Sequence, residues 1–257
     1  MKLLPQIDET LDCILAGNIQ LLQGKSGYRT AIDAPLLAWF AAQQAPLARV
    51  ALELGAGTGL VAIVLARALP NVRVQLLETQ PQLVDRALRN ARLNAVEDRL
   101  EVVHGDVAQP PQLPGPFDLV LCNPPYLARE HGHPPANAER RIAHQETTAT
   151  LRQFCQAAAV QLRPGAPSCW VFPHHGAQRL LDDLAAVGLR DCAVMRVLHR
   201  ASDAQPNRVL ICARAGTAQV RTLADRPIHV EDQPDRVFHP DLARFFAGLA
   251  ESALPPK

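Results

Sequence analysis

The sequence lacks an excess of charge of either sign: 26 Lys and Arg residues stand against 25 Asp and Glu residues, for a net charge of +1. Proteins held to nucleic acid mainly by bulk electrostatics carry a strong basic excess, so the composition argues against that class. Lysine is scarce, with Lys2, Lys25 and Lys257 alone. The basic charge is therefore nearly all arginine. That bias can serve phosphate recognition, but together with many alanines it is more typical of a genome's base composition.

Long hydrophobic runs are also missing, and none approaches the roughly 18 residues of a membrane-spanning helix. The N-terminus has no long apolar stretch and no small-residue cleavage site, so we expect no secretory signal and a cytoplasmic protein. The six cysteines form no Cys-x-x-Cys pair, which favours buried free thiols in a reducing compartment over disulfides or zinc. These cysteines are Cys13, Cys122, Cys155, Cys169, Cys192 and Cys212.

Apolar residues are plentiful, at 48% of 257 residues, with 20% charged. This composition predicts one large globular domain and excludes general disorder. Short apolar runs alternate with helical patterns. The predicted strands are 49–54, 72–77, 100–103, 117–122, 168–172, 192–198 and 207–213, and the predicted helices are 57–69, one from about 81, 146–162 and 176–187.

This alternation predicts an α/β fold with a mostly parallel sheet, helices on both faces, and an antiparallel hairpin at one edge. We expect three regions. Residues 1–46 form an extension of a hairpin and a helix packed on the core, 47–214 form the core, and 215–257 form a C-terminal segment with a frayed end.

A glycine-rich turn joins the first core strand to its helix. Gly55, Gly57 and Gly59 follow Glu53, and glycines at such a place let a ligand approach the backbone near a helix N-terminus. The dinucleotide-binding pattern would place its third glycine at Leu60, so the turn departs from a pyrophosphate site. The spacing fits a ligand without phosphates, although a tight strand–helix connection alone would also use glycine.

Two more acidic residues close the following strands. Glu78 ends the second, where a carboxylate can accept hydrogen bonds from both ribose hydroxyls, and Asp106 ends the third. Either could instead be a helix cap or a solvated carboxylate. Acidic residues at three successive strand ends, Glu53 included, predict a nucleoside pocket.

The segment Glu-Leu-Gly-Ala-Gly-Thr-Gly at 53–59, with acids at 78 and 106, resembles the S-adenosylmethionine site of class I methyltransferases. The resemblance implies a Rossmann-like, seven-stranded, mostly parallel sheet with an antiparallel edge strand. It places the turn against the amino-acid part of the cofactor, Glu78 at the ribose and Asp106 near the adenine amino group. The cofactor-binding residues that it implies are Glu53, Gly55, Ala56, Gly57, Gly59, Glu78, Asp106 and Asn123.

The fourth strand runs directly into Asn123-Pro124-Pro125-Tyr126. The prolines stiffen the backbone and remove two donors, which leaves carbonyls as acceptors. The Asn123 oxygen and the Pro124 carbonyl can hold both hydrogens of an exocyclic amine, whose delocalised lone pair makes it a poor nucleophile, and orient it for methylation. Tyr126 can stack on a flipped base. Asn123, Pro124 and Tyr126 are thus the predicted catalytic residues, unless the segment is merely a proline turn.

This motif resembles the amino-methyltransferases that act on adenine, cytosine or guanine amino groups, or on the glutamine amide of release factors. Segments at 8–12, 20–23, 27–29, 32–34 and 227–230 resemble the bacterial transfer-RNA adenine-N(6) methyltransferases, which modify adenosine 37 of valine tRNA. The resemblance implies an RNA substrate. One departure is Ala143-His144-Gln145-Glu146, where that family tends to show Ala-Arg before the glutamate.

The main alternative is a release-factor glutamine methyltransferase, and an rRNA base amino-methyltransferase stays open. The release-factor enzymes normally carry a helical domain before the turn and Glu-Pro-x-x-Ala-Leu after the tyrosine, and neither is visible here. A nicotinamide-dependent oxidoreductase is disfavoured by Leu60. A non-catalytic RNA-binding protein on a decayed methyltransferase is disfavoured by the intact motif at 123–126.

Contacts to the substrate are weakly indicated. Arg86, Arg89 and Arg92 recur at helical spacing, a pattern more typical of a solvated face than of RNA contact. The pairs His174-His175 and His131-x-His133 are more typical of loops than of a metal site, so no metal is predicted, and a monomer is the default. The predicted substrate-binding residues are Tyr28, Arg29, Pro125, Arg129 and Arg141.

Overall fold

The computed structural model describes residues 4–26, 29, 32–125, 149–231 and 237–251. All seven strands predicted for the core are present. They are β3 (Val50–Leu54), β4 (Arg73–Glu78), β5 (Leu100–His104), β6 (Leu119–Cys122), β7 (Ser168–Pro173), β8 (Leu189–Leu198) and β9 (Arg208–Ala215).

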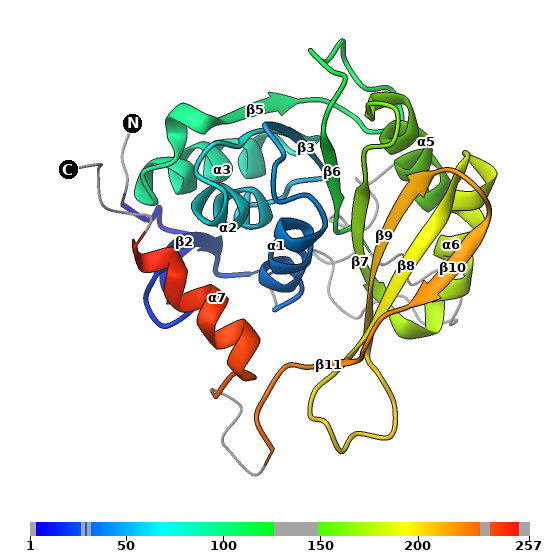
Figure 1. The fold of residues 1–257 in the computed structure, drawn as a ribbon. Coiled ribbons are helices and arrows are strands. Elements are labelled where there is room, and N and C mark those ends of the chain that lie inside the picture. Colours follow the sequence, from blue (N-terminus) through cyan, green and yellow to red (C-terminus); the bar gives the residue numbers. More distant parts are fainter. Residues whose placement is uncertain (1–3, 27–28, 30–31, 126–148, 232–236, 252–257) are drawn as a thin grey trace.

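These strands form one twisted sheet in the order β8-β9-β7-β6-β3-β4-β5 (Figure 1). The pairs from β7 to β5 are parallel, whereas β9 runs antiparallel to both β7 and β8. Two short strands, β10 (Gln219–Thr222) and β11 (Arg226–Pro227), add to β8 in parallel. The predicted α/β, Rossmann-like fold is confirmed, and the antiparallel pair lies one strand inside the edge.

The helices that follow β3, β4, β6 and β7 match the predicted alternation, and two of them begin with a local signal. Pro81 occupies the first turn of α3, and Thr150 and Gln153 form a capping box at the start of α5. Among the described residues the helices are α1 (Asp33–Gln44), α2 (Leu60–Ala68), α3 (Pro81–Leu93), α5 (Leu151–Gln161), α6 (Ala177–Ala186) and α7 (Pro240–Glu251), with 3-10 turns η1 (Glu97–Arg99) and η2 (His174–Gly176).

The helices cover both faces of the sheet. Apolar side chains of α1, α2, α3 and α7 form one buried cluster with one face, and those of α5 and α6 form a second with the other face. Within the described ranges, no helix has both the length and the apolar character needed to cross a membrane. Five of the six cysteines are buried free thiols as expected, but Cys13 is exposed.

The N-terminal region contains a hairpin of its own, β1 (Glu9–Ile14) and β2 (Ile19–Gly24), which forms a separate two-stranded sheet. The hairpin packs against α3, with Ile19, Leu21 and Leu22 fully buried. Since an isolated hairpin is marginally stable in water, this docking is what holds it.

Candidate active site

The strand register brings the predicted site segments to one edge of the sheet. Leu54 at the end of β3 is in register with Leu77 of β4 and with Cys122 at the end of β6. The residues that follow these positions, Gly55, Glu78 and Asn123, therefore leave the sheet side by side. This is the carboxyl edge, where open α/β sheets bind their ligands.

The glycine turn after β3 has a backbone that requires glycine. Gly55, Gly57 and Gly59 have φ values of +67°, +57° and +79°, a region that L side chains rarely adopt. The N–H groups of Gly55 and Ala56 both donate to the Leu77 carbonyl, over 2.9 and 3.1 Å. The turn is thus fixed to the end of β4.

The three glycines meet different surroundings. A Cβ at Gly59 would lie 3.1 Å from Leu76 Cδ2, and one at Gly55 would lie 3.2 Å from Phe154 Cε1. A Cβ at Gly57 would meet no atom of the described chain within 4 Å. Gly55 and Gly59 therefore permit close internal packing, whereas Gly57 faces open space at the site.

Glu78 holds the turn from the β4 side. Its Oε2 accepts the Gly57 N–H over 2.7 Å, and its Oε1 accepts the N–H groups of Thr79 and Gln80, each over 3.0 Å. The residue is only 5% exposed, and burial raises the pKa of its carboxyl despite these bonds. Oε2, with one donor, retains capacity for a ligand hydroxyl.

Glu53 lies deeper, at 2% exposure, and its Oε2 accepts the Ala62 N–H over 3.0 Å. Burial, reinforced by the charge of Glu78, raises the pKa of Glu53 to about 8. The carboxyl is therefore mostly protonated at neutral pH. A cation bound at the turn would favour its ionised form.

Asp106 follows β5 at the same edge and is half-buried. Its Oδ1 accepts the Ala108 N–H over 2.8 Å, which closes a small turn. Next to it, Gly105 donates to the Glu78 carbonyl over 2.9 Å, so the ends of β4 and β5 are joined where the nucleoside was predicted.

The Asn123-Pro124-Pro125 segment begins immediately after β6. Asn123 and Pro125 are partly exposed, and Pro124 is buried. The preceding Cys122 is fully buried, and burial raises the pKa of its thiol well above the ordinary value, which makes it a poor nucleophile. Tyr126 lies outside the described residues, as do Tyr28, Arg129 and Arg141.

Arg29, predicted to contact substrate, lies against the hairpin. Its guanidinium forms an ion pair with Asp12 over 2.5 Å and donates to Thr10 Oγ1 and the Gly24 carbonyl, each over 3.1 Å. The side chain is 43% exposed, so these contacts leave part of the guanidinium at the surface.

The solvated-face interpretation of the α3 arginines is wrong for two of the three. The Arg89 and Arg86 side chains are 2% and 13% exposed, and both bind Glu9 of the hairpin. Arg92 is exposed as expected. Helical spacing alone could not reveal this, because the buried carboxylate comes from a strand far away in the sequence.

An ion pair that the sequence did not indicate lies at the same edge of the sheet. Arg208 at the start of β9 donates from Nε to Asp33 at the start of α1 over 3.0 Å, and the Asp33 side chain is 6% exposed. The pair joins α1 to the strand beside β7. Asp33 belongs to the segment 32–34, which resembles the tRNA adenine-N(6) methyltransferases, whereas no feature of the sequence pointed to Arg208.

The groups at this edge fit S-adenosylmethionine. Glu78 offers a buried acceptor for hydroxyls, Glu53 a carboxyl that a cation would ionise, and Gly57 open space beside the backbone. In the ranges that the structure describes, no cluster of three or more His, Cys, Asp or Glu side chains could hold a metal ion.

A family model described as the methyltransferase small domain matches residues 33–175. Among curated relatives, the tRNA1(Val) (adenine(37)-N6)-methyltransferase of Actinobacillus pleuropneumoniae serotype 7 is 32% identical over 163 residues, covering 63% of this chain and 67% of that protein. The corresponding protein of Porphyromonas gingivalis strain W83 is 32% identical over 136 residues, with 51% and 53% covered.

The release factor glutamine methyltransferase of Mycolicibacterium smegmatis is 38% identical over 138 residues, covering 51% of this chain and 48% of that protein. The matches thus span about half to two thirds of these relatives. A solved structure of a predicted O-methyltransferase from Agrobacterium tumefaciens has a TM-score of 0.67 at 21% identity, covering 85% of this chain and 97% of that chain. That likeness shows the fold.

Proposed function

Because the chain belongs to the methyltransferase small domain family, and is an S-adenosylmethionine-dependent methyltransferase, we propose that it methylates the exocyclic amino group of an adenine in RNA. The substrate that we favour is tRNA near the anticodon. We propose the site at the carboxyl edge as its active site, with Glu53, Gly55, Ala56, Gly57, Gly59, Glu78, Asp106 and Asn123 at the cofactor.

The observation that carries this proposal is the register of β3 and β6. Leu54 pairs with Cys122, so the first residue of the glycine turn and Asn123 leave neighbouring strands at the same level. A methyl donor on the turn and an amine held by Asn123 would therefore meet without a large movement of either segment, which is the basis of catalysis by proximity.

Bound S-adenosylmethionine would supply an electrophilic methyl group, and the broken S–CH₃ bond would leave S-adenosylhomocysteine as the product. The Asn123 side-chain oxygen and the Pro124 carbonyl accept the two N–H groups of the substrate amine, which fixes the direction of its lone pair. These acceptors also stabilise the positive charge that grows on the nitrogen as it is methylated. The excess proton then leaves to water. Tyr126 and Pro125 are predicted to pack on the base, and Tyr28, Arg29, Arg129 and Arg141 to contact the rest of the substrate.

The choice of RNA rests on the names of relatives. Two that cover half or more of this chain are named tRNA1(Val) (adenine(37)-N6)-methyltransferases. The match to a release factor glutamine methyltransferase supports the second candidate, a glutamine amide, which offers the same planar NH₂ group to Asn123 and Pro124.

Replacement of Asn123 tests the chemistry. Asn123→Ala should abolish methyl transfer while weakening the binding of S-adenosylhomocysteine far less, because the acceptor for the amine is lost but the turn and the other proposed cofactor contacts are untouched. Asn71→Ala is the matched control, since Asn71 is exposed in the turn before β4, at the amino end of that strand. Full transfer by Asn123→Ala would overturn the mechanism.

The substrate is tested by nucleoside mass spectrometry of tRNA from cells that lack the protein. Loss of N(6)-methyladenosine from a tRNA, restored by the wild-type chain and not by Asn123→Ala, is the expected result. An unchanged tRNA profile together with an undermethylated release factor would favour the glutamine substrate.

A further inference from the structure

Asn90 of α3 and Asn94, the residue that caps the C-terminal end of this helix, take the place of a third strand beside the N-terminal hairpin. The Leu22 N–H donates to Asn90 Oδ1 over 2.7 Å, and Asn90 Nδ2 donates back to the Leu22 carbonyl over 3.2 Å. Asn94 does the same at Gln20, over 3.0 and 2.7 Å. Each side-chain amide thus pairs with one backbone residue of β2 as a neighbouring strand would.

The two amides differ in where their second N–H goes. Asn90 Nδ2 donates to the Thr58 carbonyl of the glycine turn over 3.0 Å, whereas Asn94 Nδ2 donates to the Asn90 carbonyl within α3 over 2.8 Å. Asn90 is fully buried, and Asn94 is 4% exposed. The asparagines are therefore a natural matched pair, of which one also touches the turn.

The glycine turn is consequently held from two sides. Glu78 accepts the Gly57 N–H from the end of β4, and Asn90 donates to the next residue, Thr58, from the middle of α3. Gly57 borders the open space where the cofactor is proposed, and Thr58, which is buried, follows it directly in the chain. The direction of the Thr58–Gly59 peptide is set by the Asn90 bond.

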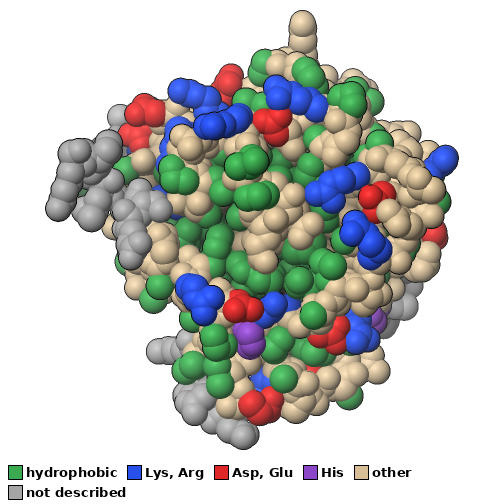
Figure 2. Space-filling view, in the orientation of Figure 1, with side chains coloured by type: hydrophobic (Ala, Val, Ile, Leu, Met, Phe, Trp, Pro, Cys, Tyr) green, Lys and Arg blue, Asp and Glu red, His purple; other side chains and the backbone are tan. Residues whose placement is uncertain are grey.

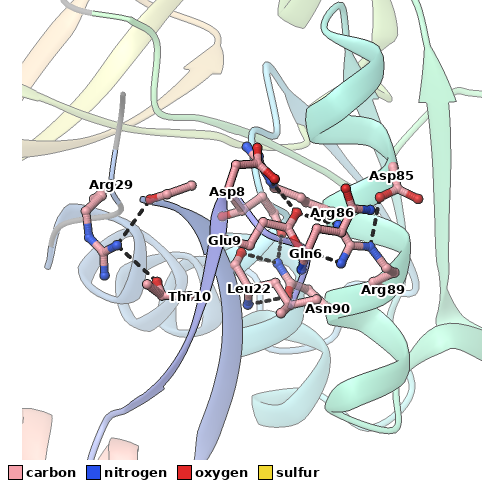
Figure 3. Close-up of polar contacts among 12 residues, drawn as sticks. Gln6, Asp8, Glu9, Thr10, Leu22, Arg29, Asp85, Arg86, Arg89 and Asn90 are labelled. Carbon is pink, nitrogen blue, oxygen red and sulfur yellow. Dashed lines mark hydrogen bonds and ion pairs between the residues drawn. The ribbon is translucent and has the colours of Figure 1, made fainter. Parts of the chain in front are cut away.

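The hairpin itself is fixed on α3 by buried ion pairs (Figure 3). Both Arg89 Nη atoms bind the Glu9 carboxylate, over 2.8 and 2.5 Å, and Arg89 Nε binds Asp85 over 2.8 Å. Arg86 adds a 2.8 Å bond from Nε to Glu9. Leu22 and Asn90 lie beside this cluster in Figure 3. The ion pairs of Glu9 in β1 therefore hold the hairpin on α3 next to the point where Asn90 binds β2.

We propose that Asn90 is a positioning residue of the S-adenosylmethionine site, which couples the docking of the N-terminal hairpin to the conformation of the glycine turn. Both N–H groups of its amide are used, one on the Leu22 carbonyl of β2 and the other on the Thr58 carbonyl of the turn, while Oδ1 accepts the Leu22 N–H. A displacement of the hairpin therefore alters the donor that orients the Thr58 carbonyl. The inference rests on the proposed location of the cofactor at this turn.

The test compares Asn90→Asp with Asn94→Asp. Each nearly isosteric change removes two N–H donors and disturbs the same strand, so the two variants should lose similar thermal stability. Asn90→Asp should bind S-adenosylhomocysteine roughly tenfold more weakly in calorimetry, because it also loses the bond to the turn. Its KM for S-adenosylmethionine should rise by a similar factor, while kcat at saturation stays within about twofold. Asn94→Asp should leave both constants near wild type.

Equal affinities in the two variants would overturn the proposal. If the wild-type protein itself fails to bind S-adenosylhomocysteine, the proposed cofactor site is wrong. That result differs from equal affinities in the two variants, which would overturn only the role of Asn90.

Hydrogen exchange in the wild-type protein gives a second test that needs no variant. Coupling between sites is reciprocal, so cofactor binding at the turn should stabilise the Asn90 contacts. S-adenosylhomocysteine should slow exchange of the Leu22 amide, which donates to Asn90, more than that of the Gln20 amide, which donates to Asn94. Equal protection at both amides would contradict the coupling.

Discussion

Gly57 differs from its two neighbouring glycines in what a side chain would encounter. All three have positive φ, but Gly55 and Gly59 are enclosed by Phe154 and Leu76, whereas the space beside Gly57 contains no described atom. A Cβ at Gly57 would therefore collide with a ligand on the turn and not with any described atom of the protein. Its effects on binding and on folding can be separated.

Gly57→Ala should weaken S-adenosylhomocysteine binding about tenfold or more, while backbone strain lowers the free energy of unfolding by about 1–2 kcal/mol. Gly165→Ala is the control, because Gly165 has φ +77° and also meets nothing within 4 Å, but lies before β7 at the other end of the sheet. It should lose similar stability and bind normally. Calorimetry and urea unfolding measure the two effects, and equal binding by both variants would place the ligand elsewhere.

Single residues differed in how far the sequence could predict them. The conformation of the glycine turn and the place of Glu78 at a strand end could be predicted because their signals are local: positive φ selects glycine, and a strand end follows from a short apolar run. The partners of Asn90 and Arg89 lie in the hairpin, some 70 to 80 positions away in the chain. No local pattern encodes such a pairing, so both residues looked like ordinary helix positions.

At the scale of elements, the hairpin and α3 are joined by charge as well as by apolar packing. The Glu9 side chain is 1% exposed and accepts bonds from Arg89, Arg86 and the Gln6 backbone. These bonds, that from Arg89 above all, lower the pKa of Glu9 from 4.5 to about 2. Removal of one partner from a buried pair is costly because the other charge remains buried.

Glu9→Gln should lower the free energy of unfolding at pH 7 by about 2–4 kcal/mol, since Arg89 loses its buried counter-ion and keeps only the more exposed Asp85. A carboxylate with a lowered folded pKa stabilises above its unfolded pKa, and this contribution disappears as the pH falls from about 4.5 to about 2. The difference between wild type and variant in urea unfolding should therefore shrink across that window. Glu97→Gln, at an exposed position in η1, should show little difference at any pH. A gap that stays constant down to pH 2 would refute the Glu9 ion pair.

At the scale of the whole molecule, the balance of charge is visible on the surface. Figure 2 shows Lys and Arg side chains interspersed with Asp and Glu on the face drawn, with hydrophobic side chains grouped near its middle. Together with the net charge of +1, this argues against a broad basic surface for nucleic acid.

The proposed binding of tRNA should therefore depend only modestly on salt concentration. We expect the slope of log K against log salt concentration to lie between about −2 and −4, as for a few phosphate contacts. Fluorescence anisotropy with labelled tRNA across a salt series gives this slope, and Arg92→Ala on the exposed side of α3 serves as a surface control. A slope of about −8 or steeper would mean an extensive basic interface.

The fold of the core was largely predictable, because each core strand is a short apolar run bounded by a turn, and α3 and α5 carry start signals at Pro81 and Thr150. The short strands β10 and β11 were not, since they carry no apolar alternation of their own: β10 is exposed throughout. Their conformation is imposed by pairing with β8. In the candidate site, the common edge followed from parallel topology, whereas the Asp33–Arg208 pair required the tertiary structure.

The asparagine pairing of β2 also bears on how the chain behaves in a crowded solution. A strand with unpaired N–H and C=O groups at the rim of a small sheet is a template on which another chain can add a strand, which leads to aggregation. Asn90 and Asn94 occupy those groups at Leu22 and Gln20. Side-chain amides cannot continue a strand ladder. The hydrogen-bonding groups of β2 at Leu22 and Gln20 are therefore paired, and no further strand can be added there.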